Sequence, residues 1–289
     1  MNQSIEIKAF FEPNTNTVTY VVSDKKTKES AIIDSVLDFD VASGRTSTHS
    51  SDQVIEYIQQ MNLTNRWILE SHAHADHLSA APYLKQSVGG LIAISEHIKE
   101  VQVIFKDIFN LESDFLPDGS QFDQLLQDGQ TLKLGDSTIH VLHTPGHTPA
   151  CLSYLIDDAI FVGDTLFMPD FGTARTDFPG GSAVTLFNSI KRILSLPDST
   201  RIFTCHDYKA QGRDLYAWES TVADQNANNI HINSNVTEQE FIDYRNTRDA
   251  SLSMPKLILP SVQINIRAGN MPPKEDNGIA YLKLPINSL

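Results

Sequence analysis

Cysteine is scarce in this sequence: Cys151 and Cys205 are the only two among 289 residues. Two cysteines are too few for the disulfide framework that stabilises many secreted domains. No apolar run approaches the roughly 20 residues of a membrane-spanning helix, and no apolar stretch of signal-peptide length follows the N-terminus. These absences predict a cytoplasmic protein with reduced thiols and no contact with a membrane.

Basic residues are also in deficit. The chain has 22 Lys and Arg against 36 Asp and Glu, a formal net charge of −14. Such a surface repels phosphates, so we expect no nucleic-acid partner. The apolar fraction of 40% and the charged fraction of 20% are ordinary for globular proteins. The length suits one α/β domain covering residues 1–289.

Strand-like and helix-like segments alternate along the chain, which favours a layered α/β fold. Residues 17–23 and 30–34 are rich in β-formers and flank a charged turn, so they predict a hairpin. A helix is expected around Val54 to Met61, with Ser50 or Ser51 as its N-cap, and a capping box starts another helix at Thr237. Further strands are expected at 67–69, 91–94, 138–142, 152–156, 159–162 and 201–204, and further helices at 80–85, 97–109 and 183–194.

The segment from His72 to His77 reads His-Ala-His-Ala-Asp-His and directly follows the strand predicted at 67–69. Histidines two residues apart on an extended turn can both point at one centre, and the small alanines leave space for an ion. Imidazole nitrogens and carboxylate oxygens suit both Zn²⁺ and Fe²⁺. The alternative is a chance surface cluster of histidines.

Three more potential ligands favour a metal site over a chance cluster, because each also follows a predicted strand. His147 comes after a Pro-Gly turn, Asp164 after the strand at 159–162, and His206 after the strand at 201–204. Side chains placed at strand ends by a rigid sheet are the usual arrangement in α/β enzymes.

The segments 72–77, 144–148, 163–165 and 204–208 resemble, in order, the metal motifs of the metallo-β-lactamase superfamily. The resemblance covers residues 67–208 and leaves 209–289 as a C-terminal extension. It implies an αββα sandwich with the site at the edge shared by its two sheets. It also implies seven metal-binding positions, namely His72, His74, Asp76, His77, His147, Asp164 and His206.

This ligand set permits a dinuclear Zn or Fe hydrolase of the glyoxalase II type, acting on a thioester or lactone. In such an enzyme Asp164 would bridge two ions about 3.5–4 Å apart, and a bound hydroxide would attack a carbonyl. The fold alone does not decide the reaction, because it hosts many.

The segment Arg175-Thr176-Asp177-Phe178, with the later His206-Asp207-Tyr208, resembles the persulfide dioxygenase branch. The resemblance implies one Fe²⁺ per chain, held by His72, His147 and Asp164, and oxidation of glutathione persulfide by O₂ to sulfite. Two imidazoles and one carboxylate leave three positions open on Fe²⁺. A persulfide sulfur and O₂ could therefore meet at the metal. Zn²⁺ is the alternative or substitute ion.

Four residues remain: His74, Asp76, His77 and His206. They would support the ligands of a mononuclear site, or form the second metal site of a dinuclear one. We expect Asp76 to accept a hydrogen bond from a ligating imidazole.

Three residues are candidates for substrate contact. Arg175 could orient a substrate carboxylate, or brace its loop by pairing with Asp177, which we favour. Tyr208 could contact substrate or only cover the pocket. Arg267, with other tail arginines, could bind an anionic thiol such as glutathione, although each is individually more typical of a surface or packing residue.

Several points stay open in the sequence. Thr173-Ala174 stand where the mitochondrial-type dioxygenases have Cys-Gly, which leaves the thiol carrier open and resembles the bacterial branch labelled β-lactamase-like hydrolase. A non-catalytic metal or persulfide sensor is a third function, and the complete ligand set argues against it. A homodimer is left open as the assembly. Cys205, at a predicted buried strand end, is expected to be an inert core residue.

Overall fold

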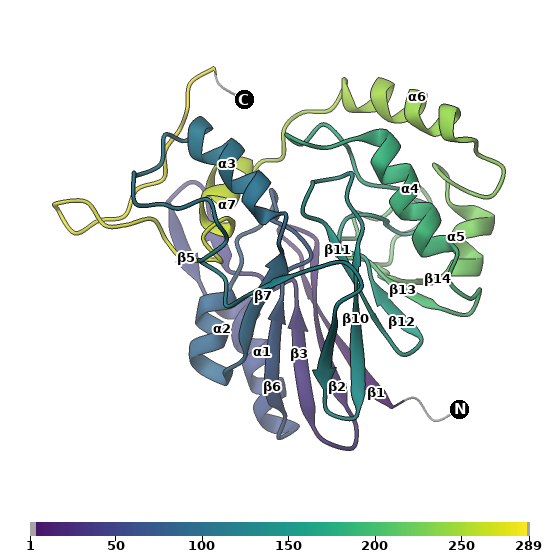
Figure 1. The fold of residues 1–289 in the computed structure, drawn as a ribbon, viewed down its shortest axis with the longest axis horizontal. Helices are drawn as coiled ribbons and strands as arrows, with labels where there is room; N and C mark the ends of the chain where they lie inside the picture. Colours follow the sequence, from purple (N-terminus) through teal and green to yellow (C-terminus); the bar gives the residue numbers. More distant parts are fainter. Residues whose placement is uncertain (1–3, 288–289) are drawn as a thin grey trace.

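Two six-stranded sheets lie face to face between helices in the computed structural model, which describes residues 4–287 (Figure 1). The first sheet has the order β1-β2-β3-β6-β7-β8, with strands Ile5–Glu12, Thr17–Asp24, Glu29–Ile33, Thr64–Leu69, Leu91–Ser95 and Gln124–Leu126. The second has the order β14-β13-β12-β11-β10-β9, with strands Glu219–Thr221, Arg201–Phe203, Ala159–Phe161, Leu152–Ile156, Ser137–His143 and Thr131–Leu134. A small pair, β4 (Asp38–Asp40) and β5 (Arg45–Ser47), lies outside them.

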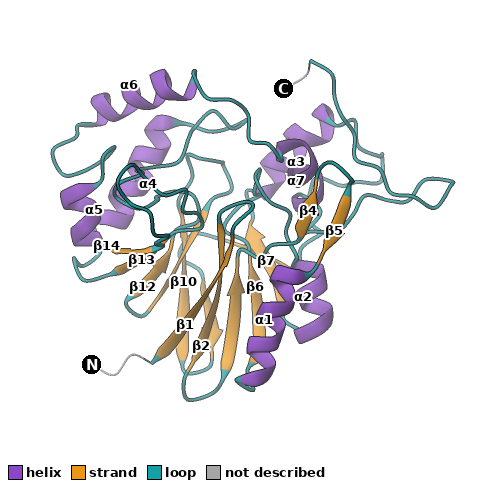
Figure 2. Cartoon of the chain, turned by 180° about the vertical axis from the view of Figure 1, so that it is seen from behind, coloured by secondary structure: helices purple, strands orange, loops and turns teal. Residues whose placement is uncertain are grey.

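Seven helices within the described residues form the outer layers: α1 His49–Gln60, α2 Ala81–Val88, α3 Ile98–Ile108, α4 Ala183–Leu194, α5 Val222–Asn228, α6 Glu238–Asp249 and α7 Ile258–Asn265. Helices α1 and α2 flank the first sheet and α4 and α5 flank the second (Figure 2). The αββα sandwich expected from the motifs is confirmed.

Alternation along the strands produces these layers. In β2, Val18, Tyr20 and Val22 point into the apolar cluster between the two sheets, whereas Val21 packs in the cluster beneath the outer helices. In β12, Ala159 and Phe161 face the first sheet and Ile160 faces α4. Successive side chains of a strand point to opposite faces, so a strand covered on both sides must be apolar throughout.

Strand direction gathers the predicted ligands at one edge. In the second sheet β10 and β13 both run parallel to β12, because β11 lies antiparallel between β10 and β12. The carboxyl ends of these three strands therefore share an edge, and the segments holding His147, Asp164 and His206 follow them. In the first sheet the loop with His72 follows the carboxyl end of β6.

Several local predictions are confirmed, among them the hairpin β2-β3, strand β11 at 152–156, helix α4 at 183–194 and the capping box of α6 at Thr237. The predicted N-cap of α1 is wrong. Thr48 occupies that position, while Ser50 Oγ donates to Asp38 and Ser51 Oγ donates to the carbonyl of Val36. These two serines tie the preceding loop to the helix instead of capping it.

The C-terminal extension is built into both layers. It supplies edge strand β14 of the second sheet, helices α5 and α6 on that side, and helix α7 beside α3 on the other side (Figure 1). None of the helices within residues 4–287 combines the length and apolar character needed to span a membrane. That residues 1–289 form one domain stays a prediction.

Arg245 on α6 holds the extension against the loop that carries Arg175. Its side chain is only 2% exposed, forms an ion pair with Asp249 and donates to the carbonyl of Thr173. Asp249 in turn accepts from the backbone N–H and hydroxyl of Thr176. A buried charge network of this kind is costly to break, because the remaining carboxylate is left without its partner.

We therefore predict that Arg245→Ala lowers the free energy of unfolding by about 3–5 kcal/mol. Arg248→Ala is the matched control, because Arg248 lies on the same helix with its side chain exposed. Its effect should stay within about 0.5 kcal/mol. Urea unfolding of the metal-free proteins measures both, and equal effects would show that Arg245 contributes no more than a surface arginine.

Candidate metal centre

Four chain segments meet at the shared edge of the sheets and bring all seven predicted ligand residues together. All seven are buried except Asp76, which is partly exposed. Donor atoms of His74, Asp76, His77 and His206 lie within 4.8 Å of one another, and so do those of His72, His147 and Asp164. The four motifs, far apart in the sequence, therefore form one cluster.

The first group consists of His72, His147 and Asp164. Asp164 Oδ2 lies 3.6 Å from His72 Nε2 and 3.7 Å from His147 Nε2. Both distances exceed hydrogen-bond length. The three donors thus surround a small space without bonding to one another, as ligands of one ion do.

Hydrogen bonds at Nδ1, on the side of each ring away from Asp164, orient the two imidazoles of this group. His72 Nδ1 is 3.0 Å from Ser71 Oγ, and His147 Nδ1 donates to the carbonyl of Arg175 at 2.8 Å. A partner at Nδ1 fixes the ring and leaves the Nε2 lone pair for a metal. The imidazoles nearest to Asp76 are those of His77 and His206, so its expected partnership with a ligating imidazole stays a prediction.

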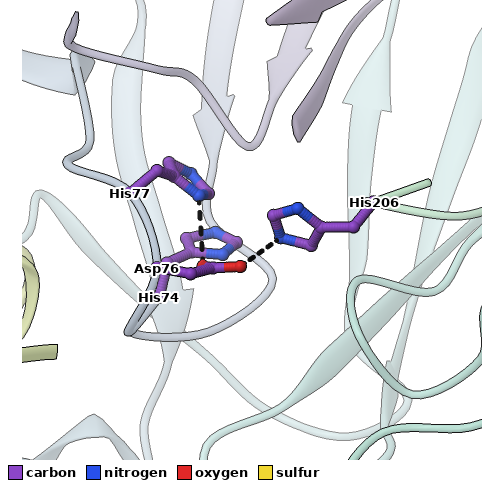
Figure 3. Close-up of side chains that lie close together, drawn as sticks. All are labelled: His74, Asp76, His77 and His206. Carbon is purple, nitrogen blue, oxygen red and sulfur yellow. Dashed lines mark ion pairs between the residues drawn. The ribbon is translucent and has the colours of Figure 1, made fainter. Parts of the chain in front are cut away.

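The second group is centred on Asp76, which lies between His77 and His206 in Figure 3. Asp76 Oδ2 is 3.0 Å from His206 Nε2, outside hydrogen-bond geometry, and accepts from Tyr208 Oη at 3.2 Å. Asp76 Oδ1 is 3.4 Å from His77 Nδ1. Asp76 Oδ2 thus has a hydrogen-bond partner in the chain, whereas Asp76 Oδ1 has none.

His74 completes the second group and is anchored to the first sheet. Its Nε2 lies 3.0 Å from Asp34 Oδ1 and 3.4 Å from Glu70 Oε2, while its Nδ1 has no hydrogen-bond partner. Asp34 also accepts from the backbone N–H of Ser71. Asp34 therefore fixes both a candidate ligand and the start of the loop between β6 and α2, which carries His72 to His77 and is called the ligand loop below.

The protonation states of two imidazoles also favour metal binding, whereas the charge of Asp34, acting against burial, raises the pKa of His74 well above its ordinary value. Burial lowers the pKa of His72 well below its ordinary value, and burial with the nearby charge of His74 lowers the pKa of His77 to about 4. Both rings are consequently neutral near pH 7. A neutral imidazole is the form that binds a metal.

Unpartnered buried atoms gather in this cluster. Among buried side-chain atoms of the described residues that lack a hydrogen-bond partner, six belong here: His72 Nε2, His74 Nδ1, Asp76 Oδ1, His77 Nε2, Asp164 Oδ1 and His206 Nε2. Leaving a buried polar atom unpaired costs about 1–3 kcal/mol. Coordination to a cation compensates this cost, so the donor set fits a metal ion.

The three candidate substrate residues differ in their position relative to the ligand cluster. Arg175 pairs with Asp177 and donates to the carbonyl of Ser253, so its side chain braces the loop. Tyr208 is 40% exposed and stacks on His206 with ring centroids 5.6 Å apart, which places it beside the cluster.

Arg267 is buried, pairs with Glu112 and lies over Phe115. Its contacts are thus with a neighbouring loop and not with the ligands. Arg213 is likewise paired, with Asp170 and Asp207. The described contacts of these two tail arginines fit packing better than the binding of an anionic thiol.

Sequence reasoning missed Asp34, Glu70 and Asn265. Asp34 carried a weak signal, an acidic residue at the end of a predicted strand, whereas Asn265 lies in a helix that was not predicted. Cys205 is buried as expected, and burial raises the pKa of its thiol. Its sulfur nevertheless lies close to donor atoms of Asp164 and His206, which the sequence did not predict.

Helix α4 seats the Pro-Gly-His turn that presents His147. Ser189 Oγ donates to the carbonyl of Pro145, and the backbone N–H of Ser182 donates to the carbonyl of Gly146. Gly146 has φ +134°, and a Cβ there would lie 2.3 Å from the backbone of Leu186. Only glycine allows this close approach.

Gly146→Ala should therefore destabilise the metal-free protein by about 3 kcal/mol or more, through backbone strain and overpacking, and should reduce metal content. Gly129→Ala is the control, because Gly129 also has positive φ, +75°, but has no atom within 4 Å of an added Cβ. Its cost should be about 1 kcal/mol, with metal content unchanged. Equal losses in urea unfolding and metal analysis would contradict this role of the close approach.

Comparison with known proteins agrees with this geometry. The profile of the metallo-beta-lactamase superfamily matches residues 13–206. A probable metallo-hydrolase of Burkholderia pseudomallei is 53% identical and covers 98% of this chain and 99% of its own length. Glyoxylase B2 of Dictyostelium discoideum is 50% identical over 100% of this chain and 99% of its own.

More distant similarity leads to persulfide dioxygenases. The human mitochondrial persulfide dioxygenase ETHE1 is 26% identical over 93% of this chain and 91% of its own. The crystal structure of ETHE1 from Myxococcus xanthus matches with a TM-score of 0.72 and 27% identity, covering 92% of this chain and all of that one. With the sandwich, the ordered motifs and the ligand cluster in place, this chain belongs to the metallo-beta-lactamase superfamily.

Proposed function

We propose that this protein is an iron-dependent persulfide dioxygenase of the cytoplasm. Its substrate is a small thiol persulfide of the glutathione type. The persulfide, O₂ and water give the thiol and sulfite: RSSH + O₂ + H₂O → RSH + SO₃²⁻ + 2 H⁺. The terminal sulfur is oxidised, O₂ is reduced, and the S–S bond breaks. One Fe²⁺ per chain would be held by His72, His147 and Asp164.

The observation that carries this proposal is the difference between the two donor groups. His72, His147 and Asp164 keep their facing atoms 3.6–3.7 Å apart, with no partner from the chain between them. Asp76, in contrast, accepts a hydrogen bond from the Tyr208 hydroxyl. The first group therefore has its facing atoms free for an ion, whereas one carboxylate oxygen of the second group is already bonded to the chain.

Two imidazoles and one carboxylate would leave Fe²⁺ with open positions at which a persulfide sulfur and O₂ can meet. The chain supplies the positioning. The carbonyl of Arg175 holds the His147 ring, and the pair of Arg175 with Asp177 fixes the loop that carries this carbonyl. Phe178 lies 6.0 Å from His147, ring to ring, and places an apolar ring beside it.

Tyr208 is the residue best placed to meet the substrate. Its ring stacks on His206, its hydroxyl donates to Asp76, and part of its surface remains exposed. A phenol at the rim can donate to a bound anion or stack on the thiol carrier. The similarity to ETHE1 proteins over more than nine-tenths of the chain supports the same reaction class.

A metal-dependent hydrolase acting on a glyoxalase-type thioester is the second candidate. The unpartnered Nε2 atoms of His77 and His206 favour it, because they could hold a second ion with Asp164 between the two. The names metallo-hydrolase and Glyoxylase B2, borne by relatives at 50% identity or more, support it as well.

Anaerobic purification followed by metal analysis and oxygen measurement separates the two candidates. We expect one iron per chain, and uptake of one O₂ for each glutathione persulfide consumed, with sulfite as the product. Two zinc ions per chain, no O₂ uptake and cleavage of S-lactoylglutathione would sink the dioxygenase proposal in favour of the hydrolase.

His147→Ala should abolish stable iron binding and reduce O₂ uptake by about 100-fold or more, beyond the range seen when only an outer hydrogen-bond partner is lost. The matched control is His140→Ala, because His140 lies exposed on β10, the strand that leads to His147. The control should keep its iron and its turnover. An active, iron-loaded His147 variant would refute the ligand assignment.

A further inference from the structure

Helix α7 of the C-terminal extension lies beside α3 in both views of the molecule (Figures 1 and 2). It is buried from Ser261 to Asn265, polar side chains included. The proposed reaction assigns no role to this helix. Its last residue, Asn265, is 5% exposed and faces the ligand loop between β6 and α2.

The side-chain amide of Asn265 makes three hydrogen bonds to that loop. Its Nδ2 donates to the carbonyls of His74 and His77, both at 2.8 Å. Its Oδ1 accepts from the backbone N–H of Ser79 at 2.9 Å. One planar group therefore fixes three backbone positions in a segment that has no helix or strand of its own.

These bonds act directly on candidate ligands. His74 and His77 contribute ring nitrogens to the cluster. The backbone carbonyls of these same two residues are the groups bonded to Asn265. Without the amide, both buried carbonyls would lack these partners. A metal site needs its ligands held within about 0.5 Å, which a free loop does not provide.

The end of α7 is itself held firmly. Gln102 of α3 donates to the carbonyl of Ile266 at 2.8 Å, and Arg267 is paired with Glu112. Gly269 passes so close to the ligand loop that an added Cβ would lie 2.9 Å from the carbonyl oxygen of Ser79. The extension can therefore act as a rigid support for Asn265.

We propose that Asn265 is a positioning residue of the metal centre, which makes the C-terminal extension part of that centre. The amide sets the backbone positions of His74 and His77 and, through them, the directions of their imidazoles. This inference depends on metal binding by the cluster and not on which reaction the metal serves.

Gln263 on the same helix provides a matched control. It is 1% exposed, and its Nε2 donates to the carbonyls of Leu259 and Lys283 while its Oε1 accepts from the N–H of Lys283. The two amides thus make the same number and kind of bonds. Only those of Asn265 reach the ligand loop.

The test compares Asn265→Asp with Gln263→Glu, each of which exchanges a donating NH₂ for an oxygen in a side chain of almost unchanged size. Apoproteins compete with a chromophoric chelator for Zn²⁺, and Co²⁺ absorption reports the ligand geometry. We expect Asn265→Asp to weaken Zn²⁺ binding by about 10–100-fold and to alter the Co²⁺ spectrum. Gln263→Glu should lower the melting temperature of the apoprotein but keep both metal properties.

Asn265→Ala, paired with Gln263→Ala, repeats the comparison without a new charge and decides the matter if the Asp variant does not fold. Wild-type Zn²⁺ affinity and Co²⁺ spectrum in a folded Asn265 variant would overturn the proposal. An equal loss in the Gln263 variants would also overturn it, because the effect would then follow from destabilised packing. Neither readout involves persulfide or O₂, so the proposed reaction can fail while this inference stands.

Discussion

Burial of a dense group of imidazoles and carboxylates is the constraint on which the rest of this structure depends. Polar atoms that lose water must find other partners, and six side-chain atoms of this cluster do not find them in the described chain. A cation supplies them. The rings of His72 and His77 have lowered pKa values, so burial itself prepares them as neutral ligands. Folding and metal binding are therefore coupled at this edge of the sandwich.

Strands and helices from both layers of the sandwich hold the buried donor atoms in place. Strand ends bring the ligand segments to one edge, and hydrogen bonds from behind then orient each ring, as the carbonyl of Arg175 does for His147 and Asp34 does for His74. Helix α4 seats one turn and α7, through Asn265, holds the other loop. The outer helices thus do more than cover the sheets: they determine where ligand atoms lie.

The family resemblance predicted the sandwich, and the strand-end motifs predicted that the seven candidate ligands lie together, because such motifs depend on short local patterns. It could not predict partners that come from distant segments. Asn265 is 188 residues from His77, and its helix has no amphipathic period, since nearly every residue of its second half is buried. The N-cap at Ser50 or Ser51 failed for the same reason: both hydroxyls bond to the preceding loop.

Because all seven donors are present in this chain, their identity does not separate an iron dioxygenase from a two-metal hydrolase, and the proposal rests on their arrangement. The central claim is that one ion lies between His72, His147 and Asp164, and that Asp76 bonds to Tyr208 and not to a metal. Anomalous diffraction at the iron and zinc edges from anaerobically grown crystals tests it most directly. The account predicts a single iron peak bonded to these three residues. Two peaks bridged by Asp164, with His77 and His206 bound to the second, would contradict it.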